Sequence, residues 1–231
     1  MDRSIPPWAM PTQETEPFEV DHVFVSVSRG GEEADRLVGW GFEEGPPNTH
    51  PGQGTACRRF YFENAYLELA WLEDEHEASS PGVDRLGLVQ RMGRVRGASR
   101  LGVAMRPTGP VRDPLPFAVW TYEPPYLEGG RSVPVATSSR LLGEPLLFFL
   151  PWEREWTAPV LPHPNGAGVV TRISMTVAPG RSVSPALQWL HESERVHVEV
   201  GSSELFTLEL DRGRQGESGT LGPGAPLRLV W

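Results

Sequence analysis

The sequence contains no lysine, and all 21 basic residues are arginine. This absence excludes chemistry that depends on a titratable amine, such as Schiff-base formation or phosphate binding by a loop lysine. There is also only one cysteine, Cys57. An internal disulfide, a Cys-x-x-Cys redox pair and a structural zinc site built from cysteines are therefore excluded. Six histidines, 30 carboxylates, the arginines and the hydroxyl groups are left to carry chemistry.

Long apolar runs and an excess of positive charge are missing as well. The longest apolar stretch, residues 145–151, is far shorter than the roughly 20 residues that span a bilayer. The formal net charge of −9 gives no basic footprint for nucleic acid or an anionic membrane. The first residues lack the charged and apolar segments of a secretory signal. We therefore expect a cytoplasmic protein with no nucleic-acid and no membrane partner, and one cysteine fits that reducing compartment.

The 25 glycines and 24 prolines favour strands joined by turns and long loops over a helical fold. Residues 1–17 predict a flexible N-terminal leader. Residues 18–72 predict a first module of the order strand, helix, strand, strand and strand. Its clearest elements are a strand at 18–27, a helix at 32–40 and a hairpin of strands at 56–62 and 66–72.

In the strands at 18–27 and 66–72, side chains alternate between an apolar face and a face that carries polar and aromatic groups. The apolar face carries Val23, Val25, Val27, Leu67, Leu69 and Trp71. The opposite face carries His22, Phe24, Ser26, Tyr66, Glu68 and Ala70. The sequence therefore predicts that His22 and Glu68 lie on the same side of one sheet.

The C-terminal part repeats the order of the first module, so that residues 169–231 predict a second one. A helix at 185–191 has Ser184 as its expected N-cap and Pro185 at its first position. The strands are expected at 171–177, 195–200, 205–210 and 226–231. Residues 73–168 form a long inter-module insert, which we expect to pack as a hairpin or arm over the sheet. Within it a short helix is expected near 84–92, and strands at 100–106 and 146–150.

These features resemble the vicinal oxygen chelate superfamily and, within it, the glyoxalase-like domain family. The resemblance is carried by the segments Asp21-His-Val-Phe-Val25, Asn48-Thr-His-Pro-Gly-Gln-Gly-Thr-Ala56, Arg58-Arg-Phe60, Tyr66-Leu-Glu-Leu-Ala-Trp71 and Glu144-Pro-Leu-Leu-Phe-Phe-Leu150. It implies an α+β fold in which two pseudo-symmetric βαβββ modules form a curved sheet around one cleft, with the long insert between them. The segment from Asn48 to Ala56 is the most specific of these motifs.

The resemblance also implies a candidate metal site. In the metal enzymes of the superfamily, a divalent ion lies between a histidine on the first strand of a module and a glutamate on its last, positions that His22 and Glu68 match. In the second module, Arg172 and Arg228 stand where further ligands are expected, and arginine has no lone pair for a metal. The site is then incomplete. The alternative is a metal-free cleft in which the two arginines face Glu68 and bind an anionic or carbonyl-rich ligand.

For other candidate residues, a functional role competes with a simpler structural one. His50 and Gln53, in the glycine-rich loop, could contact a ligand, although the same loop could only join two strands. Tyr61, Tyr66 and Tyr122 could donate a proton or a hydrogen bond inside the cleft. Cys57, in the middle of a strand among apolar residues, predicts a buried side chain and no nucleophile.

The expected function is the binding or transformation of a small carbonyl- or carboxylate-bearing molecule by lyase, isomerase or dioxygenase-type chemistry. Glu68 would be the catalytic base, His22 would hold a metal or orient the substrate, and Arg172 and Arg228 would stabilise negative charge. The alternatives are a non-catalytic, drug-sequestering protein and a scaffold protein. No organic cofactor is indicated, and a homodimer is compatible with open-edged modules. Fold likeness alone does not decide among these functions.

Overall fold

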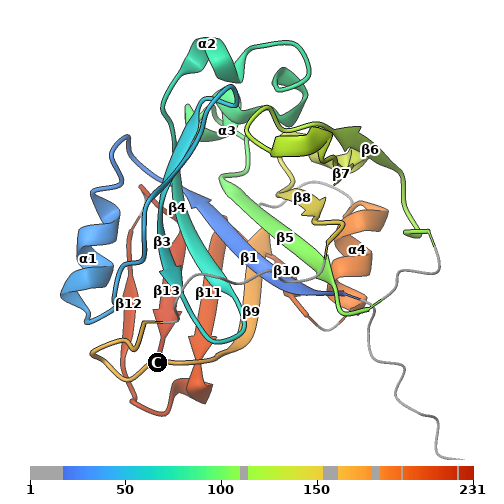
Figure 1. Cartoon of the computed structure of the whole chain (residues 1–231). Coiled ribbons are helices and arrows are strands. Elements are labelled where there is room, and N and C mark those ends of the chain that lie inside the picture. The colour runs from blue at the N-terminus through green and yellow to red at the C-terminus, as the bar shows by residue number, and fades with distance from the viewer. Residues whose placement is uncertain (1–17, 110–113, 153–160, 178–182, 194, 223) are drawn as a thin grey trace, which may run out of the picture.

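The computed structural model describes residues 18–109, 114–152, 161–177, 183–193, 195–222 and 224–231. The predicted leader, 1–17, lies outside them. Two sheets and a few short helices form an α+β fold, which confirms the predicted class (Figure 1). In the described residues, no helix is long and apolar enough to cross a membrane.

The larger sheet has eight strands in the order β2-β3-β4-β1-β5-β8-β7-β6. They are β1 (Phe18–Ser26), β2 (Asn48–His50), β3 (Thr55–Tyr61), β4 (Tyr66–Leu72), β5 (Leu101–Pro107), β6 (Val119–Tyr122), β7 (Val133–Ala136) and β8 (Leu146–Phe149). Its two halves repeat one pairing pattern, because β1 is parallel to β4 and β5 is parallel to β8. The halves meet where β1 and β5 pair antiparallel, with Val23 opposite Val103.

The second half of this sheet comes from a different part of the chain than the sequence predicts. The predicted arrangement pairs residues 169–231 with the first module around one cleft. The structure instead completes this sheet with β5, β6, β7 and β8, all within the predicted insert, and β5 lies beside β1. The strands at 100–106 and 146–150 are recognisable in the sequence, but their pairing with the first module is not. The reason is that β5 forms a full antiparallel ladder with β1, and this ladder excludes any other strand from that edge.

The C-terminal residues form a separate five-stranded sheet in the order β10-β9-β11-β13-β12. Its strands are β9 (Val170–Val177), β10 (His197–Val200), β11 (Leu205–Leu210), β12 (Ser218–Thr220) and β13 (Leu227–Val230). Here β13 is parallel to β11 and does not touch β9, whereas β4 is parallel to β1. The last strands of the two predicted modules, at 66–72 and 226–231, are therefore placed differently in their sheets.

The two sheets pack face to face through one apolar core (Figure 1). The larger sheet contributes the aliphatic face predicted for β1 and β4, with Val23, Val25, Leu67 and Leu69 all buried. The smaller sheet contributes Met175, Phe206, Leu208, Leu227 and Leu229. Because the core occupies one face of the larger sheet, the face with His22 and Glu68 is turned away from it.

The helices are short and lie at the ends of strands. They are α1 (Glu33–Gly39), α2 (Glu75–Ala78), α3 (Leu88–Met92) and α4 (Pro185–Glu192). In α4 the hydroxyl of Ser184 accepts a hydrogen bond from the Leu187 amide, and Pro185 is the first helical residue, as the sequence predicts. The predicted helix near 84–92 is a 3-10 turn (Asp84–Leu86) followed by α3.

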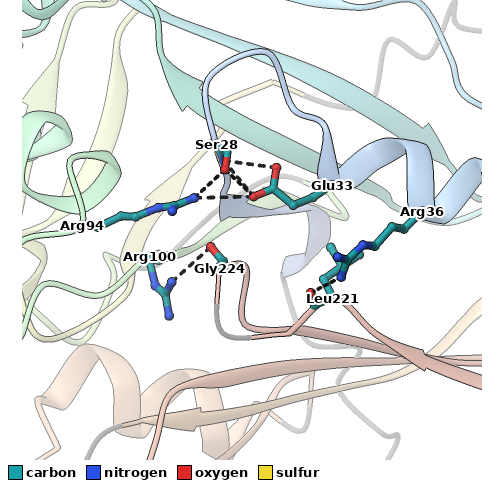
Figure 2. Close-up of polar contacts among 7 residues, drawn as sticks. All are labelled: Ser28, Glu33, Arg36, Arg94, Arg100, Leu221 and Gly224. Atoms are coloured by element: carbon teal, nitrogen blue, oxygen red, sulfur yellow. Dashed lines mark hydrogen bonds and ion pairs between the residues drawn. The ribbon is translucent and has the colours of Figure 1, made fainter.

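Arginines tie elements of the larger sheet to loops of the smaller one (Figure 2). Arg36 of α1 donates to the Leu221 carbonyl oxygen at 2.7 Å, and Arg100 donates to the Gly224 carbonyl oxygen at 3.2 Å. The Glu33 carboxylate accepts from the backbone amide and hydroxyl of Ser28 and lies 3.5 Å from a nitrogen of Arg94. These contacts fix α1 and the C-terminal loops without approaching the face of the larger sheet that carries His22.

Candidate functional site

A cavity of about 430 Å³ lies on the face of the larger sheet that points away from the core. This volume is within the range of small-molecule sites. Side chains of both halves of the sheet line it, and residues 86–92, 122–131 and 150–152 complete its wall. All of these covering residues belong to the predicted insert, so part of the insert does pack over the sheet. The rest of the insert is half of the sheet itself.

A bulge in β1 turns two consecutive residues toward this cavity. The register with β5 shifts between Val20 and His22, which leaves Asp21 as the extra residue. Asp21 and His22 therefore both line the cavity, although neighbouring residues of a regular strand face opposite sides. The bulge also explains a detail of the sequence: buried core residues of β1 have even numbers before it, Phe18 and Val20, and odd numbers after it.

Asp21 orients the imidazole of His22. Nδ1 of His22 lies 2.8 Å from Oδ2 of Asp21. Arg106 is almost fully buried and donates to Oδ1 of Asp21 at 3.2 Å and to Glu19 at 2.7 Å. Since Nδ1 is held by Asp21, Nε2 is the ring nitrogen left for a ligand.

The environment of His22 raises its pKa. Burial by itself lowers the pKa of this imidazole, but the hydrogen bond to Asp21 and the charge of Glu68 raise it more. Two rings hold the imidazole in place: Tyr66 stacks on it with centroids 4.4 Å apart, and Phe148 meets it edge-on at 5.5 Å. His22 is therefore a rigidly placed group that stays protonated to a higher pH than a free histidine.

Glu68 lies on β4 beside this imidazole and is 7 % exposed. Its carboxylate, the Cys57 thiol and an imidazole nitrogen of His50 lie within 4.8 Å of one another. Burial, followed by the charge of Glu68, raises the pKa of Cys57 far above the usual thiol value. Cys57 is therefore a protonated, fully buried thiol, and the prediction that it is no nucleophile agrees with this environment.

The glycine-rich segment from Asn48 to Thr55 forms a hydrogen-bonded rim of the cavity. The two ring nitrogens of His50 lie 2.9 Å from Oγ1 of Thr55 and 3.0 Å from Nδ2 of Asn48. Gln53 donates to Oγ1 of Thr55 at 2.9 Å and accepts from the Tyr122 hydroxyl at 2.8 Å. Burial lowers the pKa of His50, which keeps its ring neutral. The predicted residues His50 and Gln53 thus do reach the cavity, and Gln53 joins the rim to β6.

Arg59 supplies positive charge at this end of the cavity. It lines the wall from β3, and its Cα is paired with that of Glu68 on β4. Its Nε donates to the Pro46 carbonyl oxygen at 3.0 Å, which fixes one edge of the guanidinium. Its charge lowers the pKa of both His22 and His50, although burial and other contacts are larger influences on each. Sequence reasoning missed Arg59, although strand alternation from Cys57 and the hairpin register opposite Glu68 would have indicated it.

The other end of the cavity is apolar. It is lined by Leu86, Leu88 and Met92 from the covering segment and by Val133, Val135, Leu146 and Phe148 from β7 and β8. Trp152 and Leu150 close this side. The cavity therefore has one end with charged and hydrogen-bonding groups and one end that offers only dispersion contacts and burial.

The structure does not bring Arg172 and Arg228 to the cavity. Both lie on the five-stranded sheet, on β9 and β13, and both are exposed. The expected cleft in which they face Glu68 is therefore not formed, because β5, β6, β7 and β8 occupy the position predicted for their module. Of the predicted site residues, His22, His50, Gln53, Tyr66 and Glu68 line one cavity.

Sequence reasoning also missed Asp21, Asn48 and Arg131, which line the same cavity. Asn48 lies in the segment already singled out, but its side chain had no assigned role. Asp21 could have been found from the switch between even and odd apolar positions in β1. Nothing in the sequence places Arg131 there, because its position depends on how the insert folds back. The tyrosines considered as donors, Tyr61, Tyr66 and Tyr122, all line the cavity.

The donor set does not fit the divalent metal that the superfamily pattern implies. The cavity-facing positions of β5 and β8 are Gly102, Ala104, Leu146 and Phe148, and none of these side chains has a ligand atom. His22 and Glu68 are then only two of the three or four protein ligands that such a metal usually needs. The cluster of His50, Cys57 and Glu68 offers three donor types, but both ring nitrogens of His50 already lie at hydrogen-bond distance from Thr55 and Asn48.

The comparison with known families agrees with this architecture. The glyoxalase-like domain family matches residues 20–191, which span all but the first two residues of the eight-stranded sheet and the beginning of the five-stranded one. The chain therefore belongs to the glyoxalase-like domain family. This confirms the resemblance drawn from the sequence motifs.

Among solved structures, a hypothetical protein from Staphylococcus aureus is similar over 92 % of this chain and 98 % of its own, with a TM-score of 0.52 and 11 % sequence identity. At that identity the similarity concerns the fold alone. A hypothetical protein from Bacillus halodurans matches 60 % of this chain and 98 % of its own, with a TM-score of 0.37 and 16 % identity. No curated protein matches the sequence.

Proposed function

We propose that this glyoxalase-like protein binds a small carbonyl- or carboxylate-bearing molecule in the cavity and removes a proton next to its carbonyl group. The observation that carries the proposal is the placement of Glu68. A buried carboxylate stands on the wall of a ligand-sized cavity, beside an oriented imidazole and a guanidinium. A base and two stabilisers of negative charge are the groups that enolate formation requires.

The proposed step moves one proton and changes no oxidation state. A carboxylate oxygen of Glu68 takes the proton from the carbon next to the carbonyl, and the C–H bond breaks. Its electron pair forms the C=C bond of an enolate, while the carbonyl π pair moves to oxygen. Arg59 and protonated His22 stabilise the negative oxygen. Return of the proton from Glu68 to a different carbon completes an isomerisation, and loss of a leaving group completes an elimination.

Proton exchange in deuterated water tests this step without knowledge of the natural substrate. The probe is 4-phenyl-2-oxobutanoate, and proton NMR follows the loss of the signal next to its keto group. We expect the protein to accelerate this exchange and Glu68→Gln to reduce the acceleration at least about 100-fold, as the loss of a general base does. Glu217→Gln, the same change at an exposed position, is the matched control and should leave the rate unchanged.

Exchange that stays as fast in Glu68→Gln as in the wild type would refute the role of Glu68. Absence of any acceleration by the wild type, with the probe shown to bind, would refute the enzymatic proposal and favour the second candidate function.

The second candidate is a non-catalytic protein that sequesters a small molecule. The apolar end of the cavity favours it, because seven aliphatic and aromatic side chains from Leu86 to Phe148 provide burial without chemistry. In that case a bound ligand raises the melting temperature equally in the wild type and in Glu68→Gln, with no exchange or turnover in either. Melting temperatures and exchange rates of the wild type and Glu68→Gln therefore distinguish the catalytic function from the sequestering one.

Two broader expectations belong with this proposal. The protonated thiol of Cys57 fits a reducing, cytoplasmic compartment. Both sheets end in strands with an unpaired edge, β2 and β6 in the larger and β10 and β12 in the smaller, so a homodimer through a sheet edge is the proposed assembly. Sedimentation of the purified chain at the mass of one copy would contradict it.

A further inference from the structure

The two ends of the cavity differ so strongly that they restrict the kind of molecule that fits. We infer that the ligand is an amphiphilic monocarboxylate, with its carboxylate on Arg59 and its apolar body along β7, β8 and α3. This inference rests on the proposed function and adds the class of ligand to it. Three observations support the inference: the hydrogen-bond partners of Arg59, the apolar side chains at the other end of the cavity, and the volume of the cavity.

Arg59 differs from Arg58 and Arg106, which are paired with carboxylates. Its neighbour Arg58 is bound by two carboxylates, Glu44 at 2.5 Å and Asp35 at 2.7 Å, and Arg106 contacts both Glu19 and Asp21. Within the described residues, Arg59 contacts no carboxylate; its only hydrogen bonds there go to backbone carbonyl oxygens of Pro46 and Pro47. These contacts use Nε and one terminal nitrogen. The remaining N–H groups of the guanidinium are left for an external acceptor.

The position of Arg59 makes a carboxylate the matching head group. A guanidinium presents a planar fork that binds a carboxylate through two hydrogen bonds. His22 adds a second donor at the same end, because its Nδ1 is held by Asp21 and its raised pKa favours the protonated ring. The guanidinium of Arg59 offsets the negative charge of Glu68, which would otherwise repel an anionic ligand.

Arg131 is the other arginine of the cavity wall, and it is a poorer anchor. Its side chain is exposed and lies over the ring of Trp152 at 5.3 Å, on the apolar side. Charge–charge interactions at exposed positions are weakened by water and salt. The carboxylate is therefore assigned to Arg59, which is partly buried between the rim and β4.

The apolar end and the volume define the rest of the ligand. Since Leu146, Phe148 and Leu88 offer no hydrogen-bond partner, a polar tail would lose its contacts with water and gain none there. Liquid water occupies about 30 Å³ per molecule, so 430 Å³ is the volume of about 14 waters. A monocarboxylate of about a dozen non-hydrogen atoms with an aliphatic or aromatic body fits this space.

Calorimetric titration with two isosteric probes tests the inference. The probes are 4-phenylbutyrate and 4-phenylbutyramide, which differ in the charge of the head group but hardly in size, and butyrate removes the apolar body. With the wild type at pH 8, we expect the carboxylate to bind about 10- to 100-fold more tightly than the amide, the range for a charge-assisted hydrogen bond. Butyrate should bind more weakly than 4-phenylbutyrate because it leaves the apolar end empty.

Two variants identify the anchor. Arg59→Gln should lower the affinity for 4-phenylbutyrate to that for the amide and leave the amide almost unaffected. Arg228→Gln makes the same change in charge at an exposed position of the other sheet and should change neither affinity. Equal binding of the two probes, or an equal loss of both in Arg59→Gln, would overturn the inference.

A neutral ketone of the same size, 4-phenyl-2-butanone, separates this inference from the proposed function. If the ketone binds and exchanges its protons through Glu68 while 4-phenylbutyrate does not bind, the carboxylate anchor is wrong and the proposed function stands. If 4-phenylbutyrate binds through Arg59 and no carbonyl probe exchanges, the ligand class stands and the enzymatic function is wrong.

Discussion

Individual side chains of the cavity are tuned by their neighbours, and His22 shows this most clearly. Its hydrogen bond to Asp21 and the charge of Glu68 outweigh the effect of burial on its pKa. His50, in the rim, has no carboxylate on its ring nitrogens, and burial lowers its pKa. The pKa values of two imidazoles in one cavity are therefore shifted in opposite directions, upward for the ring beside Glu68 and downward for the ring in the rim.

The raised pKa of His22 predicts a pH-dependent contribution to stability. The folded state binds the proton more tightly than the unfolded chain, in which the pKa is about 6.5. The stabilisation is thus complete below that pH and is lost as the pH rises through the folded-state value. The free energy of unfolding of wild type minus His22→Gln should decrease as the pH rises above about 6.5. Chemical denaturation at several pH values measures it.

Exposed His76 provides the control for this experiment. The difference between wild type and His76→Gln is measured over the same range, since this side chain is exposed on the short helix α2 and is not part of the cavity lining. The lowered pKa of His163 acts in the opposite direction but is common to all three proteins, so its effect cancels. The charge of His22 contributes to the lowered pKa of His50, so His22→Gln also reduces that shift. A difference for His22→Gln that grows with pH would contradict the assigned shift.

At the scale of elements, the segment from Asn48 to Thr55 is held by a close backbone approach. Gly54 has φ of +73°, and its carbonyl oxygen accepts from the amides of Glu73 and Asp74 at 2.9 and 3.1 Å. A Cβ at this position would lie 2.1 Å from the Asp74 carbonyl oxygen. The glycine of the motif is therefore required for the rim to join the end of β4, whatever ligand the rim contacts.

Replacing this glycine tests the explanation. Gly54→Ala should lower the free energy of unfolding by more than about 2 kcal/mol, from steric overlap together with a left-handed backbone conformation. Gly30→Ala is the matched control, because Gly30 has φ of +84° but no atom within 4 Å of the position that a Cβ would take. Thermal and urea denaturation of both variants measure the difference. A loss no larger for Gly54 than for Gly30 would show that the contact with Asp74 does not matter.

The buried side chain of Arg91, on α3, holds elements of the insert together. It donates to the carbonyl oxygens of Leu86, Ser99 and Glu144 at 3.2, 3.2 and 2.7 Å, and to that of Ser139 at 2.5 Å. Burial lowers its pKa to about 10, so it keeps its charge at neutral pH. One side chain thus joins α3 to the loops that precede β5 and β8, and this fixes the wall opposite His22.

At the scale of the whole molecule, the five-stranded sheet covers the face of the larger sheet that the cavity does not use. Leu229 on β13 is fully buried in the shared core, while its neighbour Arg228 is exposed on the other face. The cavity is formed without any residue of this sheet. The C-terminal residues therefore support the site by stabilising the sheet on which it is built.

A pair of neighbouring substitutions tests this role. Leu229→Asp should lower the stability by more than about 4 kcal/mol, since it buries a charge between the sheets. Arg228→Asp should stay within about 1 kcal/mol of the wild type, because it exchanges one exposed charge for another. Circular dichroism during thermal unfolding measures both. Similar melting temperatures for the two variants would contradict the packing of the sheets through this face.

The sequence by itself determined the elements and the faces of the strands. Alternation correctly placed Val23 and Leu67 on the core side of β1 and β4, and His22 and Glu68 on the other side. These properties are local, since they depend on side chains two residues apart in one strand. The motif from Asn48 to Ala56 likewise identified the family and the rim of the cavity.

Only the tertiary structure decided which strand lies beside β1, and with it what faces Glu68. Apolar alternation shows that a strand has a buried face but does not name its neighbour, so β5 and β9 were equally acceptable partners in the sequence. Hydrogen bonding between distant segments selected β5. That choice filled the opposite wall with Leu146 and Phe148 instead of Arg172 and Arg228, and it left Arg59 as the cation on the cavity wall beside Glu68.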